Sequence, residues 1–104
     1  MDLKALGERL GLDEDEFLEI VEIFIDTADE DIQKLEAANI EKNCEAVSEA
    51  AHSLKGSAGN LGFEALSEIS SQVEKGARNN DIEGLSERLP VFIEKLNEIK
   101  AAYS

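Results

Sequence analysis

His52 is the only histidine in the chain, and its chemistry makes it the first candidate for a functional residue. An imidazole nitrogen without a proton is a nucleophile at neutral pH. Lys55 and Gly56 follow His52 by three and four residues, and Gly59 follows it by seven. In a helix this spacing places all three beside the imidazole on one face. A cation and two residues without side chains therefore border His52.

These residue types suit a side chain that carries a phosphoryl group. Transfer of a phosphoryl group depends on in-line geometry and charge neutralisation more than on covalent chemistry from the scaffold. Lys55 supplies a positive charge within reach of a group attached to His52. A glycine inside a helix costs about 0.5–1 kcal/mol relative to alanine, so helix stability does not explain Gly56 and Gly59. We interpret both as clearance that lets another protein approach the imidazole.

The elements that must position these residues are predicted to be helices. Apolar residues recur at helical spacing over residues 2–10, 13–38, 43–62, 64–78 and 81–103, and no segment alternates with period two. Asp13 and Asn43 are expected N-caps, and Gly62 is expected to end the third helix. Pro90 predicts a kink or a break near Leu89. The predicted fold is a single all-α domain, residues 1–104: an antiparallel four-helix bundle with a short extra N-terminal helix that caps one end.

The third helix carries an apolar stripe on the side away from His52. At 100° per residue, His52 lies roughly 160° from the centre of this stripe, so we expect the imidazole to face solvent. The stripe consists of Val47, Ala50, Ala51, Leu54, Ala58 and Leu61.

The composition of the chain argues against some classes of partner. The net charge of −14 argues against nucleic acid and anionic membranes as partners, because both require a basic surface. Cys44 is the only cysteine, so no internal disulfide forms, and no signal peptide or membrane span is visible. We expect a monomeric cytoplasmic protein. The start at Met1 with a capped first helix favours a complete gene product.

Two other functions are compatible with parts of the sequence, and a third is excluded. The main alternative is a helical bundle that docks a partner without phosphotransfer chemistry, in which His52 is incidental. Glu49 and His52 have the Glu-x-x-His spacing of di-iron bundles, but such a site needs two copies that face the bundle interior. A hydrolase built on Cys44 and His52 is excluded, because the two lie eight residues apart on one helix with no third group to orient them.

The segment from Ala51 to Gly62, AHSLKGSAGNLG, resembles the signature of histidine-containing phosphotransfer (HPt) domains. The family pattern is His-x-Leu-Lys-Gly-x-(Ser/Ala)-x-x-(apolar)-Gly, and every fixed position is filled. The expected order and lengths of the helices are also similar to those of the family, so the resemblance covers nearly the whole chain.

The resemblance implies a phosphorelay function: His52 would be phosphorylated on Nε2, and Lys55 would help to neutralise the phosphoryl group. The partners would be receiver domains of response regulators or hybrid histidine kinases, which exchange the group through an aspartate. The Mg²⁺ needed for transfer would belong to the receiver, so no cofactor or metal is expected in this chain. The expected receiver-binding surface surrounds His52 and comprises Glu45, Ser48, Glu49, Gly56 and Gly59.

Two further expectations concern the limits of this activity. The chain has no Gly-rich phosphate loop and no room for a nucleotide-binding domain, so we expect a phosphocarrier without ATP-dependent kinase activity of its own. Some family members have a glutamine 22 residues after the histidine, bonded to the imidazole; here that residue is Glu74. A carboxylate there could orient the ring but would repel a phosphoryl group.

Overall fold

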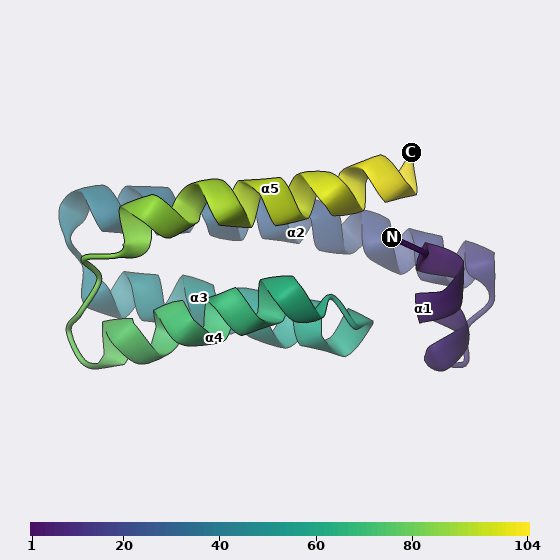
Figure 1. Cartoon of the computed structure of the whole chain (residues 1–104), viewed down its shortest axis with the longest axis horizontal. Coiled ribbons are helices and arrows are strands. Elements are labelled where there is room, and N and C mark those ends of the chain that lie inside the picture. The colour runs from purple at the N-terminus through teal and green to yellow at the C-terminus, as the bar shows by residue number, and fades with distance from the viewer.

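The computed structural model describes all residues, 1–104, and it is all-helical as predicted (Figure 1). It contains five helices, which are α1 (Leu3–Arg9), α2 (Glu14–Glu41), α3 (Cys44–Leu61), α4 (Glu64–Arg78) and α5 (Leu85–Tyr103).

Helices α2 to α5 form an elongated antiparallel four-helix bundle, and the molecule measures 41 × 21 × 17 Å. α3 packs against α2 and α4, and α5 packs against the same two helices from the other side. Figure 1 shows α3 and α4 side by side below α2 and α5, with α1 at one end of the bundle. α1 packs against the first part of α2, where Gly7 allows close approach: a Cβ on Gly7 would lie 2.9 Å from Cβ of Phe17. The predicted capping helix is therefore present.

Local sequence signals set several helix ends. The side chain of Asp13 accepts a hydrogen bond from the N–H of Glu16 (2.8 Å), and the Glu16 side chain accepts one from the N–H of Asp13 (3.2 Å), which completes a capping box at the start of α2. Asn43 caps α3 by accepting a bond from the N–H of Ala46 (3.1 Å). Gly62 ends α3 with a φ of +83°, a conformation that favours glycine. These three predictions are confirmed.

α2 is longer than the predicted segment 13–38. It continues through Glu41 and ends at Lys42, which adopts a left-handed conformation with a φ of 58°. The N–H of Lys42 bonds back to the carbonyl groups of Ala38 and Asn39, which closes the last turn. No glycine lies at this end of the helix, so the sequence pattern predicted the end of α2 too early.

The last helix begins later than predicted, and the break that Pro90 allowed near Leu89 is absent. α5 begins at Leu85, because Asp81 accepts a bond from the N–H of Glu83 (3.3 Å) and holds a turn before the helix. α5 also runs through Pro90 without a break. Leu85 and Phe92 are both buried, so core packing on either side of Pro90 holds the two parts in one helix despite the missing N–H.

The core contains 22 buried apolar residues drawn from all five helices and the turn before α4. Every member of the predicted α3 stripe is among them. Because the stripe faces the core, the opposite side of α3 faces outward and presents His52. No helix is both long enough and apolar enough to cross a membrane.

Candidate functional site: a histidine held by a buried glutamate

His52 lies on the outer face of α3, as the periodicity predicts. Its side chain is 62% exposed, whereas the neighbouring Ala51 and Leu54 are fully buried. The buried neighbours fix the helix against the core, so the imidazole projects from a rigid support. This places the ring where a second protein can reach it.

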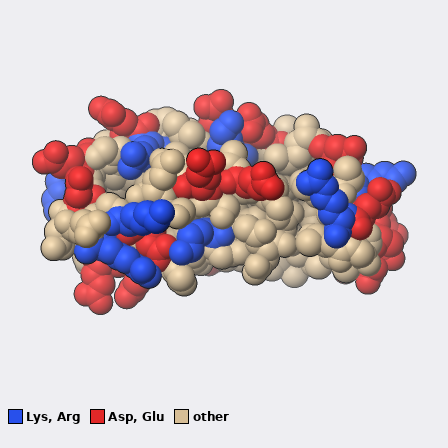
Figure 2. Space-filling model, turned by 60° about the horizontal axis from the view of Figure 1, so that its bottom comes forward, with Lys and Arg blue, Asp and Glu red and all other residues tan.

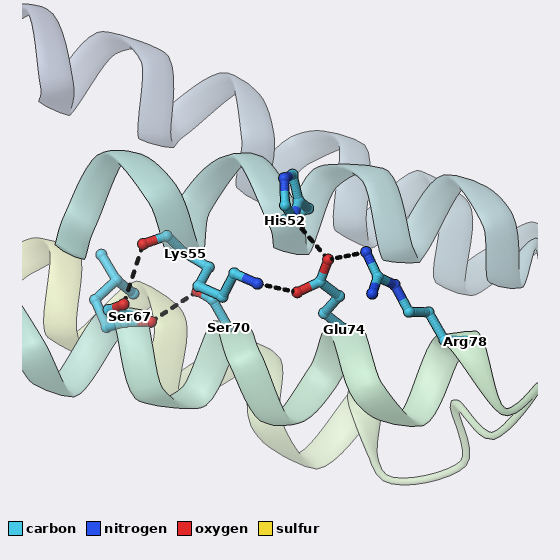
Figure 3. A network of polar contacts seen from close by, with 7 residues as sticks. His52, Lys55, Ser67, Ser70, Glu74 and Arg78 are labelled. Carbon is cyan, nitrogen blue, oxygen red and sulfur yellow. Dashed lines mark hydrogen bonds and ion pairs between the residues drawn. The ribbon is translucent and has the colours of Figure 1, made fainter. Parts of the chain in front are cut away.

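The inner edge of the imidazole contacts Glu74 of α4. Nδ1 of His52 lies 2.7 Å from Oε2 of Glu74 (Figure 3). An ionised carboxylate can only accept a hydrogen bond, so Nδ1 carries the proton and donates it. In a neutral ring this leaves the lone pair on Nε2, the nitrogen on the opposite side of the ring. Glu74 therefore selects the tautomer in which the outward nitrogen carries the lone pair.

Glu74 is also the partner of two cations. Nζ of Lys55 lies 2.6 Å from Oε1, and a terminal guanidinium nitrogen of Arg78 lies 2.8 Å from Oε2. Figure 3 shows the carboxylate between the two cations, with His52 approaching from α3 above it. On the face formed by α3 and α4, Lys and Arg side chains gather toward the end where α4 ends, although the protein is acidic as a whole (Figure 2).

The environment of Glu74 keeps it ionised. Only 3% of its side chain is exposed, and burial by itself raises the pKa of a carboxyl group. The hydrogen bonds from Lys55 and His52, together with the positive charges of Arg78 and Lys55, outweigh burial and lower the pKa of Glu74 below its usual value of 4.5. The carboxylate is therefore negatively charged at neutral pH, and the two cations offset the repulsion that a bare carboxylate would exert on a phosphoryl group.

The two glycines beside His52 differ in their surroundings. A Cβ on Gly56 would meet no atom within 4 Å, which is consistent with the predicted clearance. A Cβ on Gly59 would lie 3.2 Å from Oγ of Ser67 on α4. That hydroxyl donates to the backbone carbonyl of Lys55 at 3.0 Å (Figure 3). Gly59 therefore allows α3 and α4 to pack closely, a role that its interpretation as clearance for another protein did not include.

The other residues expected near the receiver lie N-terminal to His52 on α3. Glu45 and Glu49 are exposed, and Ser48 is half-buried. Glu49 borders an open groove of about 340 Å³ between α2 and α3. The groove also contains Ser53, whose hydroxyl donates to the buried carboxylate of Asp31 at 2.7 Å. This bond ties the turn of α3 that carries His52 to α2.

Sequence reasoning missed Arg78 and Asp31. Arg78 stands four residues after Glu74, a spacing at which opposite charges pair on a helix, so this signal was available. Asp31 has no local signal, because its contact with Ser53 depends on how α2 and α3 pack. No group of three or more His, Cys, Asp or Glu side chains is arranged to hold a metal ion.

Comparison with known families agrees with this geometry. Residues 19–102, most of the 104-residue chain, match the Hpt domain family. No curated protein and no solved structure matches the chain. Hpt domains are helical phosphocarrier modules that exchange phosphoryl groups with receiver domains. The chain belongs to the Hpt domain family, and its function is histidine phosphotransfer in phosphorelay signalling.

Proposed function

We propose that His52 is the phosphoacceptor and that Nε2 is the reacting atom. The observation that carries this proposal is the contact between Nδ1 and Glu74, which leaves the lone pair of a neutral ring on the exposed nitrogen. His52 is also the only histidine in the chain, so phosphotransfer on histidine has no other acceptor here.

In the forward step Nε2 attacks the phosphorus of a receiver aspartyl phosphate. The bond between phosphorus and the aspartyl oxygen breaks, the N–P bond forms, and the aspartate leaves as a carboxylate. The Nδ1 proton stays on the ring, which becomes positively charged. Glu74 faces that proton, so the carboxylate stabilises the charge that develops on the ring. Return of the group to another receiver reverses these changes.

Lys55 has the second role, neutralisation of the phosphoryl group. Its ammonium group shares the Glu74 carboxylate with the imidazole, and its side chain is 35% exposed, so it can turn outward on a flexible stem. The open surface at Gly56 lets the receiver backbone approach. Glu45, Ser48 and Glu49 extend the contact surface along α3, and the groove between α2 and α3 borders it. Gly59 contributes through the packing of α3 on α4.

The partners in this proposal are receiver domains of response regulators or hybrid histidine kinases. The receiver supplies the Mg²⁺ that transfer needs, and this chain acts as a cytoplasmic monomer without a cofactor or ATP-dependent kinase activity of its own. Nucleic acid and membranes are not partners, since the net charge of −14 opposes contact with polyanions.

The test is the transfer of labelled phosphate from a phosphorylated receiver. The wild-type chain should acquire a label that is stable in alkali and labile in acid, as expected for a phosphorylated histidine. His52→Gln should acquire none, and its circular dichroism should match the wild type because the side chain lies outside the core. Labelling of His52→Gln would refute the assignment. Receiver binding without labelling of the wild type would favour the docking-only alternative.

A further inference from the structure

Lys55 has two different anionic groups to neutralise, one before and one after phosphorylation of His52. In the resting structure its ammonium group neutralises a buried carboxylate, with Nζ 2.6 Å from Oε1 of Glu74. In the proposed function, on which this inference rests, the same ammonium group neutralises a phosphoryl group on Nε2 of His52. Such a group adds about two negative charges near neutral pH.

The geometry separates the two tasks. Glu74 holds the Nδ1 side of the imidazole, and the phosphoryl group is attached on the Nε2 side, across the ring. When the Lys55 ammonium group turns toward the phosphoryl group, it moves away from Oε1. Glu74 then loses one of its three donors while it stays buried, with a side chain only 3% exposed. An uncompensated buried charge is strongly unfavourable.

Arg78 is placed to prevent this loss. It bonds Oε2 of Glu74 at 2.8 Å, whereas Lys55 bonds Oε1, so the Arg78 contact does not depend on Lys55. Arg78 lies at the C-terminal end of α4, four residues after Glu74, so one helix carries both partners. Its guanidinium group keeps its charge at any relevant pH.

We propose that Arg78 is a positioning residue: it holds Glu74 in its ionised, ring-bonded state while Lys55 leaves the carboxylate for the phosphoryl group. Arg78 itself touches neither the ring nor the reacting atoms. It acts through Glu74, which keeps Nδ1 protonated and stabilises the positive charge on the phosphorylated ring.

A competing role for Arg78 is that of an exposed cation that attracts an acidic receiver, since 63% of its side chain is accessible. The two roles differ in their dependence on Glu74. Attraction of a receiver does not require the carboxylate, whereas the positioning role disappears when residue 74 is uncharged. Glu74→Gln removes the charge and keeps an amide oxygen that can accept the Nδ1–H bond.

The experiment combines Arg78→Gln and Glu74→Gln in a double-mutant cycle. The rate of transfer from a phosphorylated receiver and the fraction of label on His52 at equilibrium are measured for each variant. In the wild-type background, Arg78→Gln should slow transfer by about 10-fold or more and shift the equilibrium toward the receiver. In the Glu74→Gln background, the same substitution should change the rate by less than about 3-fold.

Two matched variants complete the design. Lys75→Gln removes the same charge one turn earlier on α4 from an exposed residue that has no ion-pair partner, and it should leave the rate within about 2-fold of wild type. Arg78→Lys keeps a cation and should restore most of the rate. Nitrogen-15 spectra of unphosphorylated Arg78→Gln should still show the proton on Nδ1, because Lys55 holds Glu74 in that state.

Three results would overturn the proposal: an equal loss in both backgrounds, a wild-type rate in Arg78→Gln, or an equal loss in Lys75→Gln. Each is distinct from failure of the proposed function, which appears as labelling of His52→Gln or as an unlabelled wild-type chain. Because Arg78 is exposed at a helix end, Arg78→Gln should fold; circular dichroism checks this, and Arg78→Lys supplies a second variant with the helix end intact.

Discussion

Gly56 and Gly59 lie on the same helix, but only Gly59 has a side chain of another helix close to it. The two glycines are therefore a matched pair for a stability test. Replacing a helical glycine with alanine stabilises a protein by about 0.5–1 kcal/mol when the new methyl group meets nothing. At Gly56 no atom lies within 4 Å of the added Cβ. Gly56→Ala should therefore gain this full amount, which corresponds to a rise in Tm of about 2–8 °C for a domain of this size.

Gly59→Ala should gain less or lose stability. The added Cβ would lie 3.2 Å from Oγ of Ser67, so that side chain must shift or rotate. Rotation breaks its 3.0 Å hydrogen bond to the carbonyl of Lys55, and a bond of this kind is worth about 0.5–1.5 kcal/mol. The loss is comparable to the gain in helix propensity, so the net effect should lie between about 0.5 kcal/mol of stabilisation and about 1 kcal/mol of destabilisation.

Removal of the hydroxyl should restore the gain. In a Ser67→Ala background the nearest remaining side-chain atom is the residue 67 Cβ, at 3.9 Å, an ordinary contact distance. Gly59→Ala should then stabilise the protein as much as Gly56→Ala does. Urea unfolding followed by circular dichroism measures each free energy of unfolding. Equal stabilisation by both alanines with Ser67 present, or destabilisation by Gly56→Ala, would refute the reasoning.

A larger substitution at Gly56 tests its role in phosphoryl transfer. Gly56→Gln should leave the fold intact, because the position is open. The longer side chain should block transfer from a receiver while labelling by a small donor such as phosphoramidate is far less affected. If both donors fail equally, clearance is not the role of Gly56.

Three further predictions follow from the structure. Lys55→Ala should slow transfer by about 10- to 100-fold and lower the free energy of unfolding by about 1 kcal/mol, since buried Glu74 loses one of its donors; an unchanged transfer rate would contradict the role given to Lys55. Because the pKa of Glu74 is lowered in the folded state, its contribution to stability is present above the unfolded value near 4.5 and is lost as pH falls through the folded pKa; urea titrations from pH 7 to 2 should show a shallower decline in Glu74→Gln. Pro90→Ala should raise the free energy of unfolding by about 1 kcal/mol or more, because the exposed Pro90 lies inside α5, where proline cannot donate a helical hydrogen bond. An unchanged thermal melt would contradict this prediction.

The position of His52 could be read from the sequence because it depends on one helix alone. A period of 3.6 residues fixes which side chains share a face, and the apolar stripe fixes which face is buried. The ends of α3 are equally local, since Asn43 and Gly62 act on the backbone within a few residues. The start of α5 was predicted too early, because Asp81 holds a turn with Glu83 before the helix begins. The helix has no break at Pro90, because core packing on either side overrides the local preference.

What surrounds the imidazole was decided by the tertiary structure. The sequence placed Glu74 22 residues from His52 and left its effect on the site open. Only the rotation and axial offset of α4 against α3 bring its carboxylate to Nδ1 and between the two cations. The same packing places Ser67 against Gly59. Helical periodicity contains no information about the offset between two helices, because that offset is set by how the buried side chains of both helices interlock.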